Sequence, residues 1–153
     1  MAINPNTDFS SGAVLTAAQQ NRFPRGVVAY GQATANVLGM GTAETTQITA
    51  NAFTAVANRY YRITYYEPTA SPAGGASSQI IFRIKNGATQ LQRSELQNTG
   101  ATSAANEILC FVVTTFAAGS VTITGTAQAT AGSNIFRGAN QIAQLIVEDI
   151  GPS

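Results

Sequence analysis

The sequence predicts an all-β protein, an antiparallel β-sandwich of jelly-roll type with an extended N-terminal arm and one short helix. Two observations predict this fold. Roughly seven or eight segments alternate apolar and polar residues with period two, and turn-forming residues separate them. Beyond the arm, no segment has the 3.6-residue apolar period of a helix, which excludes alternating strands and helices. We therefore expect an anchoring arm over residues 1–25 and a jelly-roll domain over residues 26–153.

The stretch Ile108–Thr130 organises the predicted fold. Its first part, Ile108–Phe116, is a nearly continuous apolar run, as expected for a strand buried on both faces. Its second part, Val121–Thr130, places threonine and glutamine on one parity and aliphatic or small residues on the other. Because Ala117–Ser120 joins the two parts and contains a glycine, we predict a long hairpin in the middle of a layered structure.

The arm is predicted to contain the short helix. Thr16 is a suitable N-cap for a helix over residues 17–21, and Phe23 before Pro24 favours extended backbone that ends it. Beyond the arm, strands are predicted at residues 26–34, 45–56, 59–67 and 141–150, with a glycine-containing loop at 38–41.

The strand at residues 59–67 has the strongest pattern in the chain. Tyr61, Ile63 and Tyr65 share one face, and Pro68 is expected to end the strand. Farther along, Asn86-Gly87 lies between an apolar run and a second alternating segment. Asn-Gly is the strongest local signal for a type I′ hairpin, because both central residues need positive φ.

The composition limits the classes of partner. Only 10% of the residues are charged, against about 25% in a typical domain, and the net charge is +1. Electrostatic binding to nucleic acid or to a membrane is therefore not expected. A surface so poor in charge gives little protection against association, which favours a subunit of a larger assembly. Cys110, the only cysteine, lies in the apolar run and is expected to be a buried, inert thiol.

The sequence lacks the residues for the common kinds of catalysis. Without histidine and with one cysteine, it cannot form a Ser-His-Asp triad, a Cys-His pair or a structural zinc site. Glu148 and Asp149 are adjacent acids, and strand alternation directs them to opposite faces. We expect no enzymatic activity, no metal, no cofactor and no small-molecule ligand.

A cluster of tyrosine and arginine is the first candidate binding feature. Tyr60, Arg62 and Tyr66 share one strand face, and Arg83 on another strand is predicted to join them. Tyrosine and arginine are enriched at interfaces, so these four residues are candidates for a subunit interface. The alternative is that the tyrosines only cover the core and an edge of the sheet.

The arm is the second candidate. Apolar side chains are spaced along it without a regular period, and we predict that they anchor the protein to a partner, with an arginine as a charged clamp. The alternative is that the arm folds back onto its own sandwich. The predicted anchor residues are Phe9, Val14, Leu15, Phe23 and Arg25.

Four segments resemble a family of small bacteriophage virion proteins, known as minor structural, tail or head-decoration proteins. They are FSSGAVLTAAQQN, ANRYYRITYYEP, AGSVTITGTAQAT and LIVEDIGP, at residues 9–21, 57–68, 118–130 and 145–152. The resemblance implies a tumour-necrosis-factor-like jelly roll, commonly trimeric, which forms a surface module on a viral particle without catalysis.

These observations lead to one main hypothesis of function. The protein is expected to be made in a host cytoplasm and to decorate or cement the exterior of a virion as a trimer. Its partner would be the major capsid protein or another virion protein. The alternative is a tail fibre or receptor-binding module that recognises host glycans through loops at residues 69–78 and 131–140. A carbohydrate-active enzyme is a third, disfavoured hypothesis.

Overall fold

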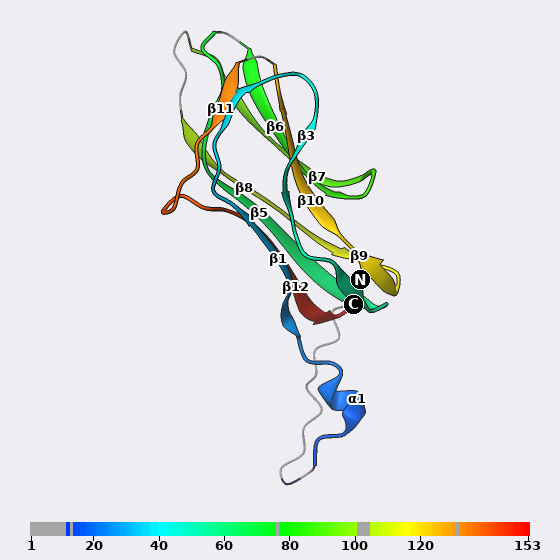
Figure 1. Ribbon diagram of the computed structural model, residues 1–153. Helices are drawn as coiled ribbons and strands as arrows, with labels where there is room; N and C mark the ends of the chain where they lie inside the picture. Colours follow the sequence, from blue (N-terminus) through cyan, green and yellow to red (C-terminus); the bar gives the residue numbers. More distant parts are fainter. Residues whose placement is uncertain (1–11, 13, 76, 101–104, 131) are drawn as a thin grey trace.

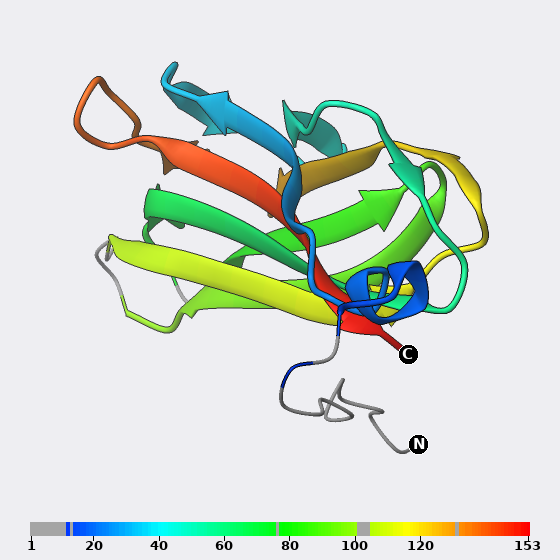
Figure 2. The same cartoon turned by 90° about the horizontal axis from the view of Figure 1, so that it is seen from below.

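The computed structural model describes residues 12, 14–75, 77–100, 105–130 and 132–153. Over these residues the chain forms two antiparallel sheets packed face to face, a two-stranded ribbon and one short helix (Figure 1). A view from below the first shows the two layers and the gap between them that the core fills (Figure 2). The predicted all-β sandwich is confirmed.

The large sheet has six strands. Its order is β1-β12-β5-β11-β2, and β8 pairs with β5 as well. The bounds are β1 Gly26–Ala33, β12 Ala143–Pro152, β5 Arg59–Ser71, β11 Ser133–Ile135, β2 Val37–Met40 and β8 Asn106–Thr115. Because β5 pairs with three strands, β12 and β11 share one of its edges and β8 lies along the other.

The small sheet has four strands in the order β3-β10-β6-β7, and a two-stranded ribbon of β4 and β9 accompanies it. The bounds are β3 Thr45–Thr49, β10 Ile123–Ala129, β6 Ser78–Asn86, β7 Thr89–Asn98, β4 Phe53–Ala55 and β9 Gly119–Val121. The strands β2, β9 and β11 were not predicted from the sequence, because each is only three or four residues long and contains or adjoins glycine.

The core lies between the sheets and follows the predicted alternation. Tyr61, Ile63 and Tyr65 on β5 are at most 1% exposed. Opposite them, Phe82 on β6 contacts the Tyr65 ring at a centroid distance of 6.0 Å. On β10 and at the end of β9, the parity predicted to be dry is buried throughout: Val121, Ile123, Gly125, Ala127 and Ala129.

The predicted hairpin over Ile108–Thr130 is wrong. Its first part forms β8 in the large sheet, and its second part forms β10 in the small sheet, so the chain crosses between layers. β8 is also an edge strand that buries only one face. Ile108 and Cys110 point into the core, whereas Leu109, Phe111 and Val113 point to solvent. The apolar run therefore combines a core face with an exposed apolar face.

Two predicted turns differ in detail. β5 continues past Pro68 to Ser71, with an irregular register between Glu67 and Ala70 that accommodates the proline. β6 and β7 form the predicted hairpin, but their turn is Gly87-Ala88, and only Gly87 has a positive φ, of 57°. Positive φ at the first central residue alone fits a type II′ turn rather than type I′.

The helix α1, Ala17–Gln20, lies beyond one end of the sandwich, on the side where β12 ends (Figure 1). Thr16 caps it, and its side chain accepts a hydrogen bond from the Gln19 N–H at 3.2 Å. The buried Arg59 fastens the end of this segment to the sandwich, because its guanidinium donates to the carbonyls of Asn21 and Phe23, at 2.6 Å each. Asp149, 1% exposed, holds Arg59 from the other side.

Candidate functional site

Among the described residues, five of the ten large hydrophobic side chains that are exposed lie on the outward side of β1, β12, β5 and β8. On β8, Leu109, Phe111 and Val113 are 61%, 58% and 48% exposed. Val27 on β1 and Ile150 on β12 lie on the same side. Strand register places Tyr30, Ile146, Thr64 and Phe111 in one row across the four strands. We call this surface the apolar face.

Few charges interrupt the apolar face. Arg62 on β5 and Glu148 on β12 are register neighbours, and their side chains form an ion pair of 2.8 Å. Glu107 lies at the start of β8, near the end of the face. Because the central arginine and glutamate neutralise each other, the middle of the face has no net charge.

The structure brings together three of the four predicted interface residues. Tyr60, Arg62 and Tyr66 all point outward from β5 on the apolar face. Arg83 does not join them, because β6 belongs to the other sheet. Its guanidinium instead contacts Glu44 at 3.6 Å and donates to the Gln90 and Gln128 side chains. The predicted grouping is therefore wrong for Arg83.

A groove opens at one end of the apolar face. β12 pairs with β5 as far as Tyr66, and β11 pairs with the same edge of β5 only at Ala70 and Ser71. Between these pairings the chain from β11 to β12 turns away from the sheet, closed by reciprocal backbone hydrogen bonds between Gly138 and Gln141. This interval leaves a hollow of about 390 Å³.

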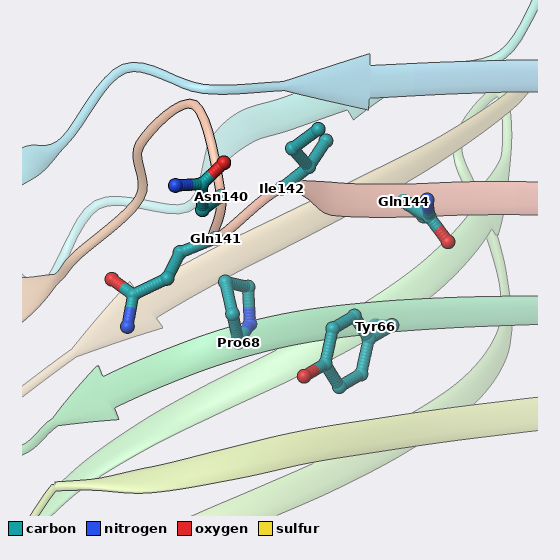
Figure 3. Close-up of a pocket in the computed structure, with 6 residues that line it drawn as sticks. All are labelled: Tyr66, Pro68, Asn140, Gln141, Ile142 and Gln144. Carbon is teal, nitrogen blue, oxygen red and sulfur yellow. The ribbon is translucent and has the colours of Figure 1, made fainter.

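Six residues line the groove, two from β5 and four from the loop and the start of β12 (Figure 3). They are Tyr66, Pro68, Asn140, Gln141, Ile142 and Gln144. None of them is charged. Among the described residues, none forms a side-chain hydrogen bond with the Tyr66 hydroxyl or with the three amide side chains.

A buried ion pair lies beneath the groove and joins its two walls. Glu67, between Tyr66 and Pro68, is fully buried, and Arg137 precedes the loop. Arg137 donates to both carboxylate oxygens of Glu67, with Nε at 2.9 Å from Oε2, and the Tyr65 hydroxyl donates to the same carboxylate at 2.5 Å. Burial raises the pKa of Tyr65 well above its usual range, and the negative charge of Glu67 adds to this. Tyr65 therefore remains a neutral donor.

The predicted anchor residues fall into two groups. Val14 is 90% exposed, and Leu15 and Phe23 are 40% exposed, so all three present apolar surface near α1. Arg25 instead lies 3.8 Å from Asp149 of its own sandwich. Phe9 lies outside the described residues. The end of the arm thus binds the sandwich, while Val14, Leu15 and Phe23 remain accessible.

The described residues contain no group of three or more His, Cys, Asp or Glu side chains that could hold a metal ion. Glu148 and Asp149 point to opposite sides of β12, as predicted, one to the apolar face and one to the core. Cys110 is buried, and this burial raises the pKa of its thiol to about 11, so it stays protonated at neutral pH. In the described part of the chain, no helix has the length and apolar character needed to cross a membrane.

The sequence did not reveal the groove. Asn140, Gln141 and Gln144 are ordinary loop and strand residues in the sequence, and Pro68 was expected to end a strand. The apolar face was also missed, because Leu109, Phe111 and Val113 were assigned to a doubly buried strand. Two signals pointed toward it, namely the charge-poor surface and the candidate interface residues Tyr60, Arg62 and Tyr66.

No protein family and no curated protein matches the chain by sequence. Among solved structures, the Eiger tumour necrosis factor from S. frugiperda superposes with a TM-score of 0.50 at 10% identity, covering 84% of this chain and 96% of that one. The carbohydrate-binding module TmCBM61, solved with β-1,4-galactotriose, gives a TM-score of 0.30 at 14% identity, with 84% and 91% covered. A carbohydrate-binding module of Cellvibrio mixtus lichenase 5A, solved with cellotriose, gives 0.27 at 18% identity, with 83% and 98% covered. The chain therefore has a tumour-necrosis-factor-like jelly-roll fold.

Proposed function

We propose that the chain is a non-catalytic structural protein of a bacteriophage particle, which self-associates through the apolar face and attaches to the particle exterior through residues 1–25. The apolar face is the observation that carries the proposal. Apolar patches of this kind on a soluble domain mark contact surfaces. The resemblance of four segments to phage virion proteins supports the particle, and the same resemblance leads us to expect a trimer.

A second copy of the chain is the partner that best suits the apolar face. The Arg62–Glu148 ion pair neutralises its centre, so a second copy brings no like charge to the contact. The net charge of +1 over 153 residues also gives little repulsion between copies. Burying side chains such as Phe111, 58% exposed, then contributes about 25 cal/mol per Å² of apolar surface removed from water.

Phe111→Asp is expected to convert the oligomer to a monomer. A carboxylate buried within the apolar contact would lose its hydration without a partner, which is strongly unfavourable. Light scattering coupled to size exclusion should give about three times 15.8 kDa for the wild type and 15.8 kDa for the variant. The fold should survive, because Phe111 points away from the core.

Leu38→Asp provides the matched control. Leu38 is 65% exposed on β2, and β2 pairs only with β11, away from β8. This variant should keep the wild-type mass. A wild-type protein that is monomeric at tens of micromolar, or a Phe111→Asp variant with unchanged mass, contradicts self-association through this face.

Attachment through the arm is tested by deleting residues 1–15. This deletion removes Phe9, Val14 and Leu15 but keeps the capped helix and the carbonyls that Arg59 binds. We expect the truncated chain to retain its oligomeric mass and to lose binding to particles that lack the protein, measured by co-sedimentation. Full occupancy of the particles by the truncated chain would show that the arm is not the anchor.

A further inference from the structure

We propose that the groove at the end of the apolar face is a binding site for a neutral saccharide. The groove shares Tyr66 with the apolar face, and its other five lining residues are not among those named for self-association. Its volume of about 390 Å³ falls within the range of small-ligand sites, about 300–1,000 Å³. It is open to solvent, since Asn140 and Gln141 in its lining are exposed (Figure 3 shows the lining residues).

The polar groups of the groove are free for a ligand. Asn140, Gln141 and Gln144 each offer two amide donors and one carbonyl acceptor, and Tyr66 offers a hydroxyl. No described residue uses these side-chain groups in a hydrogen bond. Mixed donors and acceptors on one surface suit a molecule that is rich in hydroxyl groups, because each hydroxyl both donates and accepts.

The groove also contains apolar side chains, which can contact the C–H face of a sugar ring. Tyr66 and Pro68 are two residues apart on β5 and lie beside each other in the groove, with Ile142 on the facing wall (Figure 3). An aromatic ring gives a flat apolar face with a polar edge. Together with the proline and isoleucine it can cover the C–H face of a sugar ring while the amides bind its hydroxyls.

The absence of charge from the lining selects the class of saccharide. The closest charged residues along the chain, Glu67 and Arg137, are buried and bind each other beneath the groove. A phosphate, sulfate or carboxylate would find no cation among the lining residues. We therefore assign the site to neutral sugars rather than to anionic ones.

The groove is also rigid. The Glu67–Arg137 pair joins β5 to the loop, the Phe136 N–H donates to the Thr69 carbonyl at 2.9 Å, and the Gly138–Gln141 bridge closes the loop. Walls that are already ordered reduce the entropy lost on binding. A preformed site with unused hydrogen-bonding groups is what weak carbohydrate binding requires.

The test is titration of the ¹⁵N-labelled full chain with neutral trisaccharides, followed by amide NMR. The probes are cellotriose, β-1,4-galactotriose, maltotriose and chitotriose, each to about 10 mM, which detects millimolar affinity. We expect at least one probe to shift the side-chain amide signals of Asn140, Gln141 and Gln144 in a saturable way. Glucose 6-phosphate serves as the anionic comparison and should shift them less.

Tyr66→Ala is expected to weaken this binding by about tenfold or more, since it removes the ring from the groove. Tyr60→Ala is the matched control, because Tyr60 lies on the same face of the same strand but outside the groove. Binding should persist in the Phe111→Asp variant, so a failure of self-association leaves this result unaffected. No saturable shift with any of the four probes, equal loss in both tyrosine variants, or preference for the phosphorylated sugar overturns the proposal.

Discussion

Replacing Arg137 by methionine is expected to lower the free energy of unfolding by about 3–5 kcal/mol, because it leaves the Glu67 carboxylate buried without its partner. Glu67 is 0% exposed and the Arg137 side chain 3%, so water cannot replace the lost hydrogen bonds. At roughly 2–4 °C per kcal/mol for a chain of this size, the melting temperature should fall by roughly 6–20 °C. Thermal and urea unfolding of the variant and wild type measure the effect.

Two further variants distinguish the effect of breaking the buried Glu67–Arg137 pair from the effect of losing any charged side chain. Arg93→Met breaks an exposed ion pair with Glu95, whose side chains are 45% and 33% exposed, and should cost less than about 1 kcal/mol. The double variant Glu67→Leu/Arg137→Met removes both charges and should recover much of the loss. If Arg137→Met and Arg93→Met lower the free energy of unfolding equally, Glu67 is not a buried carboxylate that depends on Arg137.

The alternation rule predicted which residues share a side on β5, β10 and β12. It placed Tyr61, Ile63 and Tyr65 on β5 in the core, and it separated Glu148 from Asp149 on β12. The rule works because successive side chains in a strand point to opposite faces, whatever the rest of the chain does. Local signals also predicted the Thr16 cap of α1 and the hairpin between β6 and β7, although not the type of its turn.

The assignment of strands to sheets could not be read from the same pattern. A continuous apolar run such as Ile108–Phe116 does not alternate, so its pattern does not tell whether its second face packs against another layer or faces solvent. Ala117–Ser120 likewise allows a tight reversal or a crossing between sheets. The outcome depends on pairing with β5 and β6, where the register partners lie 36 or more residues away in the chain.

The groove is a further case of non-local construction. Its walls come from residues 66–68 and 140–144, and the ion pair beneath it joins positions 70 residues apart. Glu67 and Arg137 appeared in the sequence as isolated charges. Only the irregular register of β5 and the loop between β11 and β12 turn them into a support for a binding surface.

Gly31→Ala is expected to lower the free energy of unfolding by about 3 kcal/mol or more. A Cβ at this position would lie 2.3 Å from the carbonyl oxygen of Thr49 and 3.1 Å from the Cα of Ala50. The backbone there cannot move aside, because Ala50 donates to the Ile123 carbonyl at 3.0 Å and Asn51 to the Tyr30 carbonyl at 3.1 Å. The contact brings β1 of the large sheet against the end of β3 in the small sheet.

Gly41→Ala is the control for the chemical change itself. An added Cβ at Gly41 meets no atom within 4 Å, so this variant should remain within about 0.5 kcal/mol of the wild type. The Gly31→Ala melting temperature should be lower than that of Gly41→Ala by roughly 6–12 °C. If the two variants melt together, β1 and β3 do not approach each other closely enough to exclude a methyl group. The two sheets would then lie farther apart along this edge, because a close approach of β1 to β3 leaves no room for a Cβ at position 31.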